Sequence, residues 1–324
     1  MKRTYILIGV LAVAMVCYYL FVFDRNESSL NPKDIAFAID DTSAVKTIAM
    51  TKVINGEDIE RIILDRLPNG TWQLDKKYPV FQPRINYLLK TMHLIHVKEK
   101  LIDEGINTAE HILELTHTRV EIYDQDGLIK SYLLGTEAKG SRGTLMKLKN
   151  ARYPYIVEMP GLQGFINTHF TLDRTIWREN LLFDGHIDKI QRISLTYPDP
   201  SKTVQLSREA IGSEWRLLGN ESPLNPDNLE KYLSNFTRKV YAESFAGDTY
   251  PGKFEDLQGK TPSVTFSLQY FSGENRTVYL FEREENPNNY FGWVEGNDEL
   301  LTVQHFVFDK FREERSYFVK GLFE

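Results

Sequence analysis

The chain is nearly devoid of cysteine. Its single cysteine, Cys17, lies in an apolar run near the N-terminus, so the part that follows cannot form a disulfide or a thiolate zinc or iron–sulfur site. We therefore expect buried apolar side chains to stabilise it. A strong excess of either charge is also missing: 39 Lys and Arg oppose 45 Asp and Glu, giving a net charge of −6. No basic cluster typical of nucleic-acid binding occurs, so we predict no nucleic-acid partner.

The motifs of the common catalytic classes are missing as well. The sequence has no G-x-S-x-G elbow, no G-x-x-x-x-G-K-[ST] phosphate loop and no G-x-G-x-x-G fingerprint. Residues 139–144, Lys-Gly-Ser-Arg-Gly-Thr, come nearest to an anion cradle, in which Arg142 would bind a carboxylate or phosphate. Glycines are equally expected in a simple loop between two strands. We predict no catalytic residues, no cofactor and no metal ligands.

What the chain does have is one long uncharged run, residues 5–23, with Lys2 and Arg3 before it. At about 1.5 Å per residue a helix over this run spans roughly 29 Å, close to the thickness of the bilayer core. The positive flank predicts a cytoplasmic N-terminus and an external remainder. The bulky residues 18–23 argue against a cleaved signal peptide. We expect a single-pass protein of the bacterial inner membrane with its bulk in the periplasm.

The remainder contains an apparent internal duplication at an offset of roughly 143 to 145 residues. The matching segments are Ile48–Thr51 with Ile193–Thr196, Trp72–Leu74 with Trp215–Leu217, and Pro83 with Pro226. After each proline the apolar residues fall at helical spacing: Ile85, Leu88, Leu89 and Met92, then Leu229, Tyr232, Leu233 and Phe236. A strand is predicted after each helix, at Val97–Leu101 and at Tyr241–Phe245.

The second half of each unit alternates with the period of a strand. Predicted hairpins pair Thr118–Tyr123 with Leu128–Leu134, and Ser263–Tyr270 with Thr277–Phe281. Hairpins with an inserted helix predict an α+β fold of antiparallel sheet and packed helices. The expected domains are an anchor at 1–24, a linker at 25–34, a first repeat unit at 35–180 and a second at 181–324.

The residues that recur are mostly core-forming, and among acidic residues only Glu99 and Glu243 recur clearly. His93 and His96 are three residues apart, a spacing that suits zinc, but His93 is expected on the solvated side of its helix. Trp177 and Arg178 form either a recognition patch or an aromatic ring stacked beneath an arginine. Arg142, Trp177, Arg178 and Trp293 are the candidate contacts to a ligand or partner.

A set of short motifs is distributed over the first unit: Phe37–Thr42, Trp72, Lys77–Val80, Arg142–Met146, Pro154–Tyr155, Pro160–Gly164 and Trp177–Asn180. Together these motifs resemble the family of domain of unknown function 4340, in the form found in Bacteroidetes-type bacteria. The resemblance implies a single-anchor envelope protein, of a kind sometimes associated with ABC-type transporters of gliding motility. It implies no reaction and no catalytic residue.

Three functions follow from these patterns. The first is a non-enzymatic envelope protein that presents two repeated units to a protein partner. The second is a module that binds a small molecule or glycan in a groove between the units, lined by aromatics such as Trp177 and Trp293. The third is an envelope-acting hydrolase, which requires at least two ionisable groups to converge from Glu99, His93, His96, Arg142, His169 and Asp173.

Overall fold

The computed structural model describes residues 32–138, 140, 143–219, 224–297 and 299–320. The predicted anchor at 5–23 and the candidate Arg142 lie outside the described residues. Within the described ranges, no helix combines the length and the apolar character that crossing a bilayer requires.

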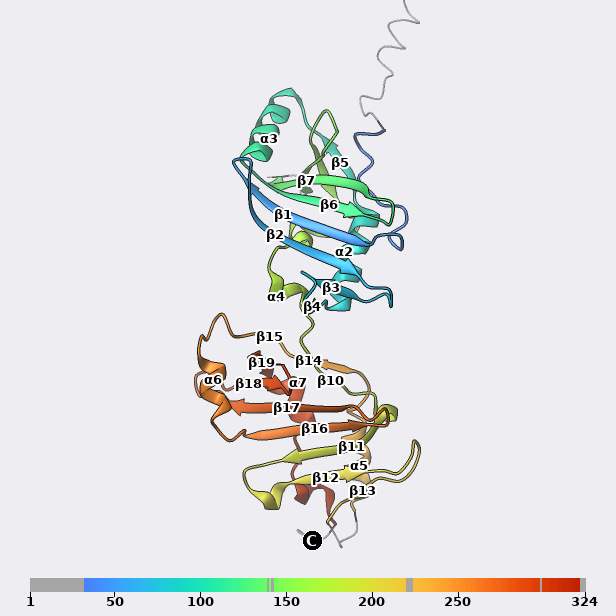
Figure 1. The fold of residues 1–324 in the computed structure, drawn as a ribbon, viewed down its shortest axis with the longest axis vertical. Coiled ribbons are helices and arrows are strands. Elements are labelled where there is room, and N and C mark those ends of the chain that lie inside the picture. Colours follow the sequence, from blue (N-terminus) through green and yellow to red (C-terminus); the bar gives the residue numbers. More distant parts are fainter. Residues whose placement is uncertain (1–31, 139, 141–142, 220–223, 298, 321–324) are drawn as a thin grey trace, which may run out of the picture. The chain divides into compact units, whose positions relative to one another are not determined.

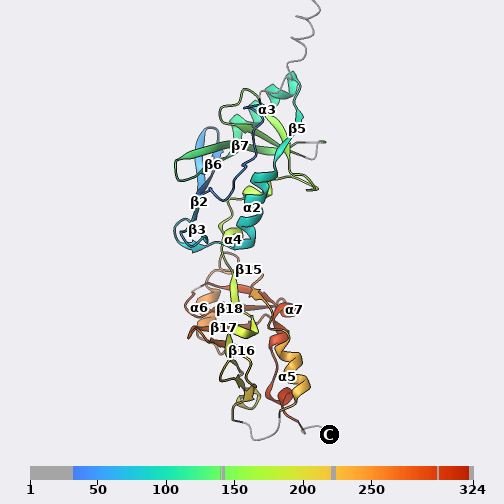
Figure 2. The ribbon, with the colours of Figure 1, turned by 90° about the vertical axis from the view of Figure 1, so that its right-hand side faces the viewer.

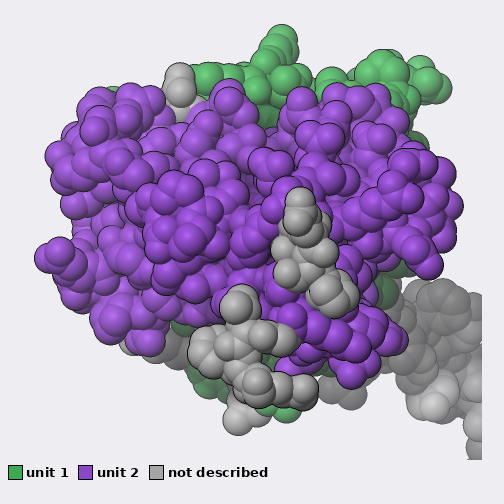
Figure 3. Space-filling view, turned by 90° about the horizontal axis from the view of Figure 1, so that it is seen from below, with its two compact units in different colours: residues 1–179 green, residues 180–324 purple. Residues whose placement is uncertain are grey.

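The chain divides into two compact units, residues 1–179 and 180–324, which Figure 3 colours separately. Both are mostly β with some helices (Figure 1). The first contains a nine-stranded sheet and the second an eight-stranded sheet, and both sheets are antiparallel. Each unit encloses a core of its own.

The sheet of unit 1 has the spatial order β4-β3-β2-β1-β6-β7-β8-β9-β5. Its strands are β1 Thr47–Ile54, β2 Glu57–Arg66, β3 Trp72–Leu74, β4 Tyr78–Pro79, β5 His96–Lys100, β6 Thr116–Tyr123, β7 Leu128–Ala138, β8 Gly143–Leu148 and β9 Tyr155–Glu158. The turn from β1 to β2 is Asn55-Gly56. Both residues have positive φ, 50° and 81°, the conformation that a two-residue type I′ hairpin requires.

One face of this sheet is covered by helix α2, Gln82–Leu94. On β1, Ile48 and Met50 are fully buried and pair with Ile122 and Val120 of β6. Pro83 lies in the first turn of α2, where its missing N–H costs nothing. The predicted apolar stripe is confirmed, because Ile85, Leu88 and Met92 are all in the core.

The opposite face of the sheet is covered in part by helix α3, Asp103–Leu115. Ala109 and Leu113 of α3 form a small second cluster with Leu145 of β8 and Ile156 of β9. Two short helices end the unit, η1 at Asn167–Phe170 and α4 at Arg174–Trp177.

The sheet of unit 2 has the order β13-β12-β11-β16-β17-β18-β19-β15, and β10 and β14 form a separate pair. The strands are β10 Leu181–Asp184, β11 Ile190–Thr196, β12 Val204–Ser207, β13 Arg216–Leu217, β14 Lys239–Tyr241, β15 Ser244–Phe245, β16 Val264–Tyr270, β17 Asn275–Glu282, β18 Asn289–Val294 and β19 Leu301–Gln304.

Helices lie on both sides of the second sheet (Figure 2). Helices α5, Pro226–Leu233, and α7, His305–Phe308, lie on the side of the main core, to which Tyr232 and Phe308 belong. Helix α6, Lys253–Gln258, lies on the other side. The remaining short helices are η2 Ile187–Lys189, η3 Pro200–Lys202, η4 Asp309–Phe311 and η5 Arg315–Phe318.

The two sheets have the same strand order apart from β4. Their central registers also correspond: Ile48 pairs with Ile122 in unit 1, and Ile193 pairs with Leu268 in unit 2. In both sheets the first strand, β1 or β11, lies inside the sheet and pairs with the first strand of the second hairpin, β6 or β16. The strand before that hairpin, β5 or β15, lies at the far edge and pairs with β9 or β19. Matched positions can therefore be compared directly through the strand pairings.

The expected single strand over 241–245 is wrong. Residues up to Tyr241 belong to β14, which pairs with β10, whereas Ser244 and Phe245 form β15 beside β19. The change falls at Ala242, whose N–H donates to the Asn180 carbonyl at 2.9 Å. The backbone thus exchanges one hydrogen-bonding partner for another within three residues, which interrupts the strand.

The expected match between Glu99 and Glu243 is also wrong by one position. In unit 1, Glu99 pairs with Ile156 of β9. The position of β19 that matches Ile156 is Thr302, and Thr302 pairs with Ser244. The residue that matches Glu99 is therefore Ser244. A bulge in β5 at Val97 and Glu99 shifts the register locally. No acidic pair is therefore shared through these two positions.

Candidate functional site

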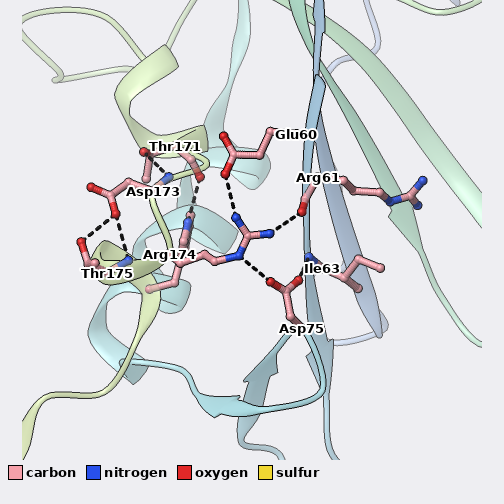
Figure 4. Close-up of polar contacts among 9 residues, drawn as sticks. Glu60, Arg61, Ile63, Asp75, Thr171, Asp173, Arg174 and Thr175 are labelled. Carbon is pink, nitrogen blue, oxygen red and sulfur yellow. Dashed lines mark hydrogen bonds and ion pairs between the residues drawn. The ribbon is translucent and has the colours of Figure 1, made fainter. Parts of the chain in front are cut away.

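The densest polar cluster in unit 1 surrounds Arg174 of α4 (Figure 4). Its Nε donates to Asp75 Oδ2 at 2.8 Å and its Nη1 to Glu60 Oε1 at 2.7 Å. Its Nη2 donates to the carbonyl of Arg61 at 2.7 Å. One guanidinium thus joins the end of the unit to β2 and to the turn after β3. Burial alone would lower the pKa of Arg174, but the hydrogen bonds to Asp75 and Glu60 raise it overall.

This cluster also fixes two local backbone features. Asp75 has a φ of 50°, which is uncommon outside glycine, and its second carboxylate oxygen accepts the N–H of Ile63 at 2.8 Å. Asp173 caps α4 by accepting the N–H of Thr175 at 2.9 Å. Because these carboxylates are occupied by structural donors, the cluster locks the turn and the helix and is poorly suited to bind an external ligand.

Trp177, a predicted ligand contact, is 0 % exposed. Its indole N–H donates to the Thr171 carbonyl at 2.8 Å, so it is a core residue and cannot stack on a ligand. An arginine does lie over its ring, but it is Arg84 at 5.4 Å and not its neighbour Arg178. Arg178 lies over the ring of Tyr78 at 3.9 Å instead. The expected pairing of Trp177 with Arg178 is therefore wrong in its partner.

Trp293, the other aromatic candidate, is partly exposed on β18. Its ring stacks on Phe281 at 4.9 Å with an interplanar angle of 20°. It also contacts Tyr279 at 5.5 Å and the edge of Phe254 of α6 at 5.2 Å. Trp293 belongs to an aromatic cluster on the side of the sheet opposite the main core.

Four of the six residues proposed for a hydrolase, His93, His96, His169 and Asp173, have separate contacts within unit 1. His93 donates from Nδ1 to the Ile39 carbonyl at 2.9 Å, and buried His169 lies 2.8 Å from Thr91 Oγ1. His96 lies 3.6 Å from Glu158, and Asp173 caps α4. Burial lowers the pKa of His169, and the charge of Arg84 lowers it further. A neutral His169 packed against Tyr87, with ring centroids 4.5 Å apart, is a core residue.

Unit 2 contains a polar cluster that the sequence analysis did not predict, where β18 meets the C-terminal helices α7 and η4. Tyr290 of β18 is 0 % exposed, and its hydroxyl donates to Asp309 and accepts from Arg312 Nη1 at 2.7 Å. Arg312 Nη1 also contacts Glu282 Oε1 at 2.8 Å. His305 stacks on the Tyr290 ring at 3.9 Å, with its Nε2 3.6 Å from Glu282.

The chemistry of this second cluster favours a structural role. Burial raises the pKa of Tyr290, so the hydroxyl keeps its proton and is a poor base. Burial alone would lower the pKa of Arg312, but its hydrogen bonds to Tyr290 and Glu282 raise it. Both groups therefore remain in one protonation state across the physiological range, whereas acid–base catalysis needs a group that titrates within it.

In both units the segment after the last strand of the sheet in sequence order, β9 or β19, is bound by a side chain at the same sheet position. We call this stretch the closing segment. Tyr290 pairs with Glu282 and Val303, and Thr144 pairs with Glu137 and Val157 at the matched place in unit 1. Thr144 Oγ1 accepts the N–H of Ile166 at 3.0 Å, as the Tyr290 hydroxyl binds Asp309. The two units thus use different side chains to fasten the segment that follows the last strand.

A third set of contacts holds the segment that follows the predicted linker. Lys130 donates to the carbonyls of Ala36, at 2.6 Å, and Ala38. Tyr132 donates its hydroxyl to the Phe37 carbonyl at 2.7 Å. Burial lowers the pKa of Lys130. Residues 36–38 are therefore fixed to β7 by side chains that bind backbone carbonyls.

In the part of the chain that the structure describes, no group of three or more His, Cys, Asp or Glu is placed to hold a metal ion. Sequence reasoning missed Arg174, Tyr290 and Arg312 because their partners lie far away in the chain and no fixed spacing signals them. Arg174 and Glu60, for example, are separated by 114 positions. No family model, curated protein or solved structure matches the chain.

Proposed function

We propose that this protein is a membrane-anchored, non-enzymatic interaction protein of the bacterial inner membrane, with both units in the periplasm. We further propose that the two units arose by duplication, as repeated α+β domains. The membrane assignment depends on residues 5–23, and the envelope assignment on the resemblance to the family of domain of unknown function 4340. A protein partner, such as a component of an ABC-type transporter, follows from the same resemblance.

The observation that best supports a non-enzymatic role is the contrast between matched positions. The shared positions of the two sheets are filled by core residues, such as Ile48 and Ile193, Met50 and Leu195. The ionisable clusters are not shared, because Thr144 stands where Tyr290 stands in unit 2. Both clusters, around Arg174 and around Tyr290, have their hydrogen bonds directed to the protein itself.

The location can be tested with one engineered cysteine. Cys17→Ser removes the native thiol, and Ser234→Cys places a new one at an exposed position of unit 2. A membrane-impermeant maleimide should label this variant in cells whose outer membrane alone has been made permeable. Labelling that requires lysis of the inner membrane would place unit 2 in the cytoplasm and overturn the proposal.

The partner can be tested by crosslinking in native membranes, followed by purification in several mild detergents. We expect a stable membrane or periplasmic protein to be recovered with the full chain. A control chain with an unrelated apolar segment in place of residues 5–23 should recover the same partner if the two units form the contact. Recovery of the protein alone under every condition would contradict an interaction role.

A further inference from the structure

The face of the second sheet that points away from the main core is polar over β11, β12 and β16, whereas α6 and an aromatic cluster cover part of it over β17 and β18. On β11 the residues Ile193 and Leu195 enter the core, so Arg192, Ser194 and Thr196 point to the opposite side. On β16 the burial pattern alternates strictly, and Thr265, Ser267 and Gln269 are the partly exposed residues. Helices α5 and α7 lie on the other side of the sheet, while α6 lies on this side, where its Phe254 contacts Trp293 (Figure 2).

The strand pairings arrange these outward residues in three rows across the sheet. Directly paired residues lie on the same face, with side chains about 5 Å apart. The rows are Arg216, Ser207, Arg192, Gln269 and Asn275; then Gln205, Ser194, Ser267 and Thr277; then Thr196, Thr265, Tyr279 and Trp293. With strands about 4.8 Å apart, the five strands of the first row extend over roughly 19 Å.

Each end of this face has a feature that a flat surface lacks. At the β13 end there is an open hollow of about 470 Å³. Its lining includes three arginines, two glutamates and two serines: Arg192, Arg208, Arg216, Glu209, Glu214, Ser207 and Ser213. Arg208 is only 7 % exposed, and Arg216 Nη1 contacts Glu209 Oε1 at 3.1 Å. At the β18 end Tyr279 and Trp293 provide adjacent aromatic rings. Between the two features the side chains are hydroxyls and amides.

The matched face of unit 1 has a different chemistry. Arg119 and Glu121 stand there at the places of Thr265 and Ser267. Arg119 contacts Asp58 at 2.6 Å and Glu121 at 3.8 Å, and Glu121 also contacts Arg61 at 3.9 Å. On sheet 1 these ion pairs occupy the surface, whereas on sheet 2 the Ser267 hydroxyl donates to the Thr277 hydroxyl at 3.2 Å, and no charge stands at these positions.

We propose that the outward face of sheet 2, from the Arg192 hollow to Trp293, binds an extended oligosaccharide. A sugar chain presents many hydroxyl groups, each both donor and acceptor, and the serine, threonine and amide side chains of the rows have the same capacity. The apolar faces of sugar rings pack on aromatic side chains, which Tyr279 and Trp293 supply. Of the arginines in the hollow, Arg192 suits a sugar that carries a carboxylate, because Arg216 is paired with Glu209 and Arg208 donates to backbone carbonyls. This binding activity goes beyond the proposed interaction with a protein.

The test measures binding of hexasaccharides to the full chain by titration calorimetry. The detergent must have no sugar headgroup, since a glycoside detergent would compete. The probes are chitohexaose and cellohexaose, which are neutral, and a hyaluronan hexasaccharide, which carries carboxylates. We expect at least one probe to bind, and a preference for hyaluronan would assign the arginine hollow to the carboxylate.

The decisive variant is Thr265→Arg with Ser267→Glu, which copies the Arg119 and Glu121 pair of unit 1 onto sheet 2. Both changes point away from the core, so folding should be retained and is checked by circular dichroism. The matched control is Thr237→Arg with Ser234→Glu, at exposed positions elsewhere in unit 2. We expect the first variant to bind at least about tenfold more weakly, which corresponds to about 1.4 kcal/mol, and the control to bind within twofold of the unaltered chain.

Two results would overturn the proposal. One is that no probe binds the unaltered chain. The other is that the two double variants bind equally well. If the first variant instead loses a protein partner recovered from membranes, with no sugar binding in any chain, the face is a protein interface. That outcome would refute oligosaccharide binding and leave the proposed interaction function intact.

Discussion

The closing segment of unit 2 is predicted to depend on a single hydroxyl. Tyr290→Phe removes that hydroxyl from a fully buried ring and leaves the aromatic packing in place. The hydroxyl lies between Asp309, to which it donates, and Arg312, from which it accepts at 2.7 Å. The change therefore removes two hydrogen bonds to charged groups that fasten the segment around α7 and η4 to β18.

The expected cost follows from the surroundings of the two partners. A hydrogen bond to a charged group contributes about 1.5–3 kcal/mol when both partners are shielded from water. Here the side chains of Asp309 and Arg312 are 49 % and 28 % exposed, so water replaces part of what is lost. Arg312 also keeps its contact with Glu282 at 2.8 Å. We therefore expect a loss of about 1–2 kcal/mol in local stability.

Amide hydrogen exchange on the full chain is the appropriate measurement. A chain of two units need not unfold in one step, so one global free energy is poorly defined, whereas local opening is resolved by peptide. A loss of about 1–2 kcal/mol is a factor of about 5–30 in the opening equilibrium. Peptides that cover 305–318 should exchange faster by that factor, while peptides of β1 and β6 in unit 1 should not change.

The control is Tyr279→Phe, in which the lost hydroxyl lies 3.5 Å from Glu295 on the outward face. Surface changes of this kind usually cost less than about 0.5 kcal/mol, so its exchange should stay within about twofold. If Tyr290→Phe leaves 305–318 as protected as this control does, the hydroxyl does not hold the segment. The structural interpretation of the Tyr290 cluster would then be wrong.

Three further predictions concern unit 1. Its amides should exchange faster as the pH falls below about 6.5, after correction for intrinsic rates, because burial lowers the pKa of His169 and of His117. Below this pH the unfolded chain binds protons that the folded unit does not, so stability falls with pH. The variant His169→Gln should reduce this pH dependence of amide exchange. Arg174→Lys keeps the charge but loses the forked contacts, so the Ile63 amide, which donates to Asp75 at 2.8 Å, should lose roughly 1 kcal/mol of protection. Lys130→Met should expose residues 35–39 to earlier proteolysis than the control Lys149→Met, because the Lys130 ammonium donates to the carbonyls of Ala36 and Ala38. Equal cleavage of the two variants would refute this role.

Much of the fold could be predicted from local patterns. The helix after Pro83 and the hairpin over 118–134 are confirmed, because periodic burial and a glycine turn are written within a short stretch of chain. The strand over 241–245 failed for the opposite reason. Its residues change partners between β10 and β19, and that choice is made by segments far away in the sequence.

The candidate contacts were harder to predict than the fold. Tryptophan is a common recognition residue, but Trp177 is fully buried. Its burial depends on how residues 171–177 pack against the core, which no local sequence pattern predicts. Trp293 was a better candidate because its place in an alternating strand puts it on the outward side. The polar rows of sheet 2 needed the register of β11, β16 and β17, and a shift by one residue would have reversed every side chain.

The comparison of the two units indicates where function is to be sought. Positions such as Ile48 and Ile193 are held to apolar residues by the core, so they can differ little without loss of the fold. Outward positions are free of that constraint, and they are where the units differ most, with Arg119 and Glu121 in one and Thr265 and Ser267 in the other. Ion pairs cover this surface on unit 1, and uncharged hydroxyl side chains cover it on unit 2. Packing does not require this difference. In the proposed oligosaccharide binding, the binding surface therefore belongs to unit 2 and has no counterpart at the matched positions of unit 1.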